Sequence, residues 1–173
     1  MKRGFHAKSV VYAAVFGALA LVFLYFGTLV PTGRWGMAAL AGLMPAVAVI
    51  SAGMSSGVIC WLGVSVLAFF VIPDKLMALL FGILFGLYPV VKCKVESLRH
   101  MALEYLLKLA FFNLSFTALF FTMKAAVLDA LPVALRVVWL LYLAGNVVFL
   151  VYDYGFTKLI SMYMARIYRK SSH

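Results

Sequence analysis

The residues of this chain that could do chemistry are few, and four of them lie in two short connectors between apolar runs. Arg34 and Trp35 follow the first apolar run, and Asp74 and Lys75 directly follow Pro73. A cation, an aromatic face and an acid on one side of a molecule could bind a polar or anionic organic compound. Arg34, Trp35, Asp74 and Lys75 are therefore candidate substrate-binding residues. The alternative is anchoring of the connectors at a membrane surface.

Two amides lie inside apolar runs, where polar side chains are costly and are functional candidates by default. Asn113 and Asn146 are each near the middle of such a run. An amide both donates and accepts hydrogen bonds, so two of them facing one cavity could hold a polar small molecule. The alternative is an interhelical hydrogen bond that fixes packing. A nearby i, i+4 pair, Glu104 and Lys108, is expected to be mutually neutralising.

The other reactive side chains do not form a catalytic pattern. The three histidines lie outside the apolar runs, the five acids are scattered, and the two cysteines form no CxxC pair. The chain contains no HExxH, GxSxG or GxxxxGK[ST] motif. We predict a protein that is not an enzyme, hydrolyses no ATP itself, and holds no metal or cofactor.

Small residues recur at four-residue spacing in the first apolar run. Ala14 and Ala18 are four apart, and so are Ala13 and Gly17. This spacing removes bulk from one stripe of a helix and lets another helix approach closely. Ala14, Gly17 and Ala18 are therefore candidate partner-docking residues, with packing inside the protein as the alternative.

The composition then sets the environment of all these residues. Of the 173 residues, 66% are hydrophobic and 12% are charged, and the mean hydropathy is +1.10. Soluble domains have roughly 45–50% apolar and about 25% charged residues. An integral membrane protein is the class that fits. The net charge of +10 then indicates contact with anionic lipid headgroups rather than nucleic acid.

The apolar runs predict an all-α membrane protein, a bundle of six transmembrane helices in a single domain over residues 1–173. Each run is long enough, or nearly so, for the roughly 20 residues that span a bilayer. The expected helices cover residues 9–30, 37–52, 57–72, 76–91, 102–123 and 133–152, with a basic amphipathic extension at 153–170.

Lysine and arginine placement predicts that both termini are cytoplasmic. With six spans the ends share one side, and that side would carry ten of the basic residues. The other side would carry four, which are Arg34, Lys75, Lys124 and Arg136. The cytoplasmic excess follows the positive-inside rule.

This arrangement resembles the substrate-capture S components of energy-coupling factor (ECF) vitamin transporters. The resemblance covers the whole chain in architecture and includes the stretch from Tyr12 to Ala20 with the connector that follows it. The family's small-residue pattern has three alanines at four-residue spacing; Ala14 and Ala18 fit, and Val22 stands at the third position. The resemblance implies a multi-pass protein of the bacterial plasma membrane. It would capture a small nutrient from outside and dock through its first helix onto a transmembrane coupling subunit driven by two ATPases.

A second class of small hydrophobic protein looks similar at this level. Rod-shape subunits of bacterial cell-envelope complexes are also built from five or six spans, and they bind protein partners rather than a nutrient. In such a membrane scaffold, the polar residues of the connectors would tolerate alanine. The small-residue stripes and the basic C-terminal segment would not.

Overall fold

The computed structural model describes residues 2–30, 32–98, 100–122, 124 and 138–171, and the side chains of 7–30, 32–98, 100–122, 124 and 139–166. The chain divides into two compact units, Met1–Val127 and Leu128–His173. Each unit is treated by itself below, and the single bundle expected from the sequence stays a prediction.

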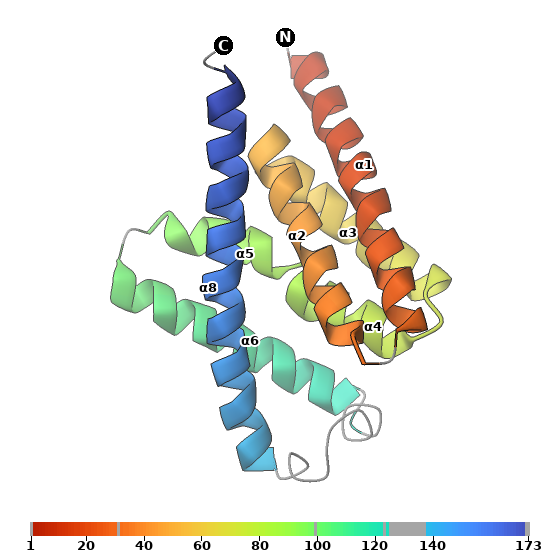
Figure 1. The fold of residues 1–173 in the computed structure, drawn as a ribbon, viewed down its shortest axis with the longest axis vertical. Helices are drawn as coiled ribbons and strands as arrows, with labels where there is room; N and C mark the ends of the chain where they lie inside the picture. The colour runs from red at the N-terminus through yellow and green to blue at the C-terminus, as the bar shows by residue number, and fades with distance from the viewer. Residues whose placement is uncertain (1, 31, 99, 123, 125–137, 172–173) are drawn as a thin grey trace. The chain divides into compact units, whose positions relative to one another are not determined.

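Three helices lie side by side at the start of the first unit (Figure 1). They are α1 (Lys2–Leu29), α2 (Arg34–Ala52) and α3 (Met54–Val71). Runs this apolar form helices in a bilayer because a helix satisfies its backbone polar groups internally, where no water can do so.

The next span is broken into three segments. It begins with α4 (Lys75–Leu79), continues as the π-helix η1 (Leu80–Phe85), and ends with α5 (Tyr88–Glu96). The helix α6 (Met101–Thr122) follows and packs against η1 and α5. The broken span contacts each of the other four helices of this unit, so it lies at the centre of their packing.

Six helices of the described residues are long and apolar enough to cross a membrane. They cover residues 7–29, 34–52, 54–71, 75–96, 101–122 and 139–166. Large apolar side chains such as Phe70, Leu114 and Phe121 are more than 70% exposed, which suits a surface solvated by lipid. The predicted all-helical, multi-pass membrane class is thereby confirmed.

The helix bounds differ from the predicted ones mainly at charged residues. The first helix begins at Lys2 rather than residue 9, and the fourth span runs to Glu96 rather than 91. In the second unit the helix α8 (Val138–Ser171) covers both the expected last span and the expected C-terminal extension; the predicted start at 133–137 lies outside the described residues. Lysine and arginine are good helix formers, so a change to polar composition did not end these helices.

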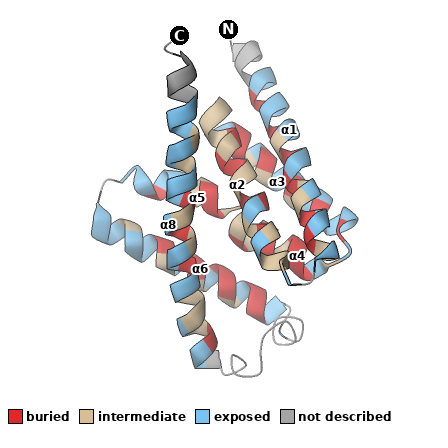
Figure 2. Cartoon of the chain, in the orientation of Figure 1, coloured by how far each residue is buried: buried red, intermediate tan, exposed pale blue. Residues whose placement is uncertain are grey.

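The core of the first unit is made largely of small residues. The buried face of α1 is a stripe at three- and four-residue spacing, visible as the red side of the helix in Figure 2. This spacing is one side of a helix. Residues of the stripe and of the facing helices form one cluster, in which more than half of the members are alanines: Ala13, Ala20, Leu24, Ala38, Ala41, Ala48, Cys60, Val64, Ala68, Ile72, Met77, Ala78 and Phe81.

The turn between α2 and α3 is held against α1 by two serines. Gly53 joins the helices with φ of +88° and ψ of 175°, a conformation that is essentially restricted to glycine. The hydroxyl of Ser9 donates to the carbonyl of Ala52 at 3.2 Å, and the hydroxyl of Ser56 donates to the carbonyl of Ser9 at 2.9 Å. These hydrogen bonds fix the position of α1 beside the turn.

Candidate functional site

Three helix termini meet at one end of the first unit. Gly27, near the end of α1, lies so close to α2 and α4 that an added Cβ would be 3.0 Å from the Cβ of Met37 and 2.5 Å from Cε of Met77. The last turn of α1 and the first turns of α2 and α4 therefore lie together. This junction holds the four predicted connector residues Arg34, Trp35, Asp74 and Lys75, and we call it the α1/α2/α4 end.

Arg34 and Asp74 form an ion pair at this end, although 40 positions separate them in the sequence. The distance between Arg34 Nη1 and Asp74 Oδ2 is 3.6 Å, and the side chains are 29% and 28% exposed. A direct charge-assisted hydrogen bond would measure about 2.7–2.9 Å, so the contact is electrostatic and loose. Trp35, the next residue in α2, is half-buried.

Asp74 and Lys75 are both engaged in ending or starting a helix. Asp74 Oδ1 accepts hydrogen bonds from the amides of Leu76 at 3.0 Å and Met77 at 3.4 Å, which is N-capping of α4. Lys75 Nζ donates to the carbonyls of Phe69 at 2.7 Å and Ile72 at 3.0 Å at the end of α3. It also lies 5.5 Å from the centre of the Phe69 ring. Lys75 is thus held by backbone oxygens and an aromatic face.

The two candidate amides lie in different units. The side-chain nitrogen of Asn113 donates to the carbonyl of Leu109 in α6, and that of Asn146 donates to the carbonyl of Tyr142 in α8, both at 2.8 Å. Each amide therefore has a backbone partner one turn earlier in its own helix. A shared ligand cavity between them stays a prediction.

A charged cluster that the sequence reasoning missed lies on α5 and α6. Glu96 Oε1 receives the ammonium groups of both Lys92, at 2.7 Å, and Lys108, at 2.8 Å. The lysine side chains are 4% and 7% exposed, whereas that of Glu96 is 41% exposed. The expected i, i+4 partner of Lys108 was Glu104; the structure instead pairs Lys108 with a carboxylate twelve residues earlier.

The cluster follows from how the α5–α6 hairpin folds back on itself. Helix packing brings Lys108 beside the last turn of α5, where Lys92 and Glu96 already share a face at i, i+4. Burying an ammonium group without a counter-charge is costly, so the contact with Glu96 stabilises both lysines. A sequence signal was present, because Lys92 directly follows one long apolar run and Lys108 lies inside another.

The π-helix is tied to α3 by a side chain. The indole Nε1 of Trp61 donates to the carbonyl of Gly82 at 2.8 Å. Further along, the amide of Gly86 donates to the carbonyl of Phe81 five residues earlier, and Pro89 has no amide hydrogen to continue the α-helical pattern. π-helical turns of this kind are frequent at functional sites.

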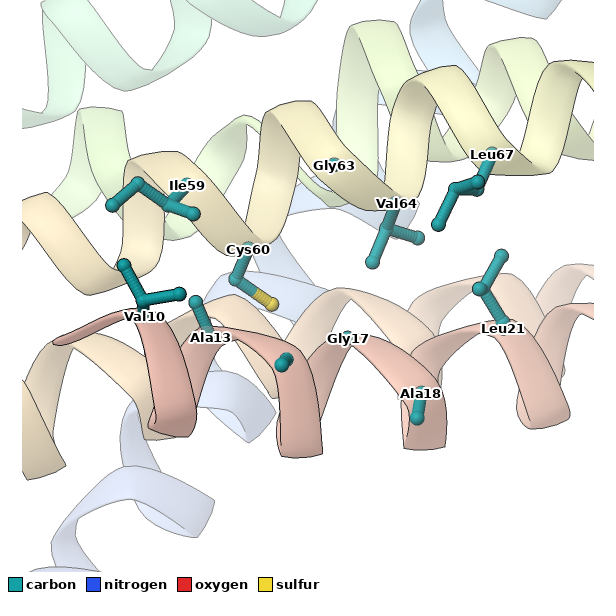
Figure 3. Close-up of a pocket in the computed structure, with 11 residues that line it drawn as sticks. Val10, Ala13, Gly17, Ala18, Leu21, Ile59, Cys60, Gly63, Val64 and Leu67 are labelled. Atoms are coloured by element: carbon teal, nitrogen blue, oxygen red, sulfur yellow. The ribbon is translucent and has the colours of Figure 1, made fainter. Parts of the chain in front are cut away.

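An apolar groove of about 280 Å³ runs between α1 and α3 (Figure 3). Its α1 side is formed by the three predicted docking residues, with Val10, Ala13 and Leu21. Ala14 and Ala18 are exposed, and Gly17 lies at the helix contact, where an added Cβ would be 3.2 Å from Val64 Cγ2. The α3 side consists of Ile59, Cys60, Gly63, Val64 and Leu67. The groove therefore opens along a stripe of small residues.

Within the part of the chain that the structure describes, no three or more His, Cys, Asp or Glu side chains gather in a way that could hold a metal ion. The polar groups at the α1/α2/α4 end can bind a polar ligand through charge and hydrogen bonds. The apolar groove can accommodate an apolar surface of complementary shape.

Fold and surface together define a multi-pass α-helical membrane protein. No protein-family model, curated protein or solved structure matches this chain.

Proposed function

We propose that this chain is a membrane-embedded substrate-capture subunit of an ECF-type nutrient uptake transporter in a bacterial plasma membrane. It binds a small polar molecule at the α1/α2/α4 end, which faces outside. Both termini and the Lys92–Glu96–Lys108 cluster face the cytoplasm. It docks through the α1/α3 groove onto a transmembrane coupling subunit whose ATPases supply the energy.

The observation that carries this proposal is the groove beside the small-residue stripe. Ala14 and Ala18 are exposed, and Gly17 and Gly63 add no side-chain bulk to the two walls of the groove. In a bilayer, helices associate through close backbone approach at small residues, because lipid tails are as apolar as the side chains. An open groove of this kind suits a helix from a second protein.

The α1/α2/α4 end supports the capture half of the proposal. Arg34 and Asp74, from two separate connectors, lie 3.6 Å apart, and both side chains remain partly exposed. A partly exposed charge pair beside a half-buried tryptophan can recognise a polar molecule that arrives from water.

Replacing a small groove residue by tryptophan tests the docking. Ala14→Trp should abolish uptake and co-purification of the coupling subunit, because the indole fills the groove. The matched control is Leu19→Trp, since Leu19 lies on α1, is 44% exposed and does not line the groove. Equal association of the coupling subunit with both variants would contradict the docking assignment.

A second candidate function is a membrane scaffold subunit without a small ligand. The observation that favours it is that Asp74 and Lys75 are engaged in capping α4 and the end of α3. Mass spectrometry of the protein gently purified from its native membrane separates the two. A retained metabolite with an ATPase module supports capture. Cell-envelope proteins without a metabolite support the scaffold.

A further inference from the structure

The two cations of the α1/α2/α4 end differ in how many of their donors are engaged. Lys75 donates to two carbonyl oxygens at 2.7 and 3.0 Å, so its ammonium group is held at the end of α3. Arg34 has five N–H donors, and its contact with Asp74 runs through one nitrogen at 3.6 Å. The guanidinium group therefore has the larger capacity to bind a new acceptor.

The two oxygens of Asp74 have separate roles. Oδ1 accepts from the amides of Leu76 and Met77, and this capping holds the carboxylate in place. Oδ2 is the atom that faces Arg34. A fixed carboxylate beside a longer, flexible arginine competes with any other anion for that arginine.

We infer that Arg34 is the anchoring residue for a small organic anion bearing a carboxylate, and that Asp74 is its intramolecular competitor. This inference rests on the proposed capture function and names the chemical class of its substrate. A carboxylate accepts two parallel N–H bonds from the planar guanidinium, a geometry that lysine cannot supply. Because the contact with Asp74 is loose, the edge of the Arg34 guanidinium remains available to a ligand carboxylate.

Three substitutions give three different expected results. Arg34→Gln removes the anchoring charge and should weaken carboxylate binding by about 10-fold or more, in line with the loss of a charged hydrogen-bonded pair. Asp74→Asn removes the competing charge, while asparagine still caps α4. It should tighten binding by about 1.5- to 5-fold, the range expected for a solvent-exposed ion pair. Lys94→Gln should leave binding unchanged, because Lys94 is an exposed cation in the last turn of α5, outside the α1/α2/α4 end.

The experiment uses benzoate and its neutral analogue benzamide as probes, with the full chain in lipid nanodiscs. Saturation-transfer NMR, corrected with empty nanodiscs, measures binding of both probes to the parent protein and the three variants. Circular dichroism checks that each variant is folded. The expected result is preference for benzoate in the parent, its loss in Arg34→Gln and its increase in Asp74→Asn.

Two results would overturn the inference. One is equal binding of benzoate and benzamide by the parent protein. The other is benzoate binding that is unchanged in folded Arg34→Gln, which would show that the guanidinium does not bind the anion, or that is lowered in Asp74→Asn, which a purely structural ion pair would predict. Because the assay needs no coupling subunit, it tests anion binding by Arg34 independently of the proposed uptake function. A native complex with ATPases and a metabolite retained equally by Arg34→Gln would contradict the Arg34 assignment alone.

Discussion

The indole nitrogen of Trp61 in α3 donates a 2.8 Å hydrogen bond to the carbonyl oxygen of Gly82 inside the π-helix. The contact joins two spans within the apolar part of the protein. It gives a backbone oxygen of an irregular helix a partner from a neighbouring helix, which is how irregular backbone is tolerated at membrane depth.

Removal of this hydrogen bond should destabilise the fold. We expect Trp61→Phe to lower the free energy of unfolding by about 0.6 to 1.7 kcal/mol, from the average to the largest value measured for hydrogen bonds between membrane helices. Trp139→Phe is the control, because Trp139 is 88% exposed. Thermal unfolding in nanodiscs compares the two, and equal midpoints would show that the Gly82 contact contributes nothing.

Two glycines of α2 should respond oppositely to alanine. A Cβ at Gly42 would lie 2.7 Å from the carbonyl oxygen of Phe85, so α2 and the end of η1 would have to separate. We expect Gly42→Ala to cost about 1–3 kcal/mol of stability, as overpacking does. A Cβ at Gly36 would meet nothing within 4 Å, so Gly36→Ala should be neutral or stabilising. Unfolding midpoints of both variants test this, and a stable Gly42→Ala would refute the close contact.

Glu96, the carboxylate that contacts both lysines of the α5–α6 cluster, should contribute more to stability than Glu104, the next acid in the sequence. Glu96→Gln removes a carboxylate that contacts both Lys92 and Lys108. We expect a loss of about 2 kcal/mol, below the roughly 3–5 kcal/mol for a fully buried pair, because Glu96 is partly exposed. Glu104→Gln should cost less than about 1 kcal/mol, because the structure pairs Lys108 with Glu96 rather than with Glu104. The reverse order of the two unfolding midpoints would favour the Glu104 pairing expected from the sequence.

The two native cysteines allow the predicted orientation to be measured without introducing further cysteines. Cys93 on α5 is exposed and Cys60 on α3 is buried. If both termini are cytoplasmic, a membrane-impermeant maleimide should label Cys93 in inverted vesicles and leave it unlabelled in intact cells. Cys60→Ala is the control for labelling of the second thiol. Labelling of Cys93 in intact cells would place both termini outside.

The sequence by itself determined the class of this protein and its six apolar helices. Hydrophobic content and the length of the runs suffice for that, because a bilayer admits helices of a defined length and leaves few other backbone choices. The spacing of Ala14, Gly17 and Ala18 also predicted a low-profile stripe, which is local helix geometry.

The tertiary structure alone decided which residues from different helices meet. The Arg34–Asp74 and Glu96–Lys108 pairs and the Trp61–Gly82 hydrogen bond depend on how helices cross and fold back. The i, i+4 rule pointed to Glu104 for Lys108, but the packing of α6 against α5 places Lys108 beside Glu96 instead. Local spacing predicts neighbours within a helix, whereas contacts between helices follow from side-chain packing across the whole unit.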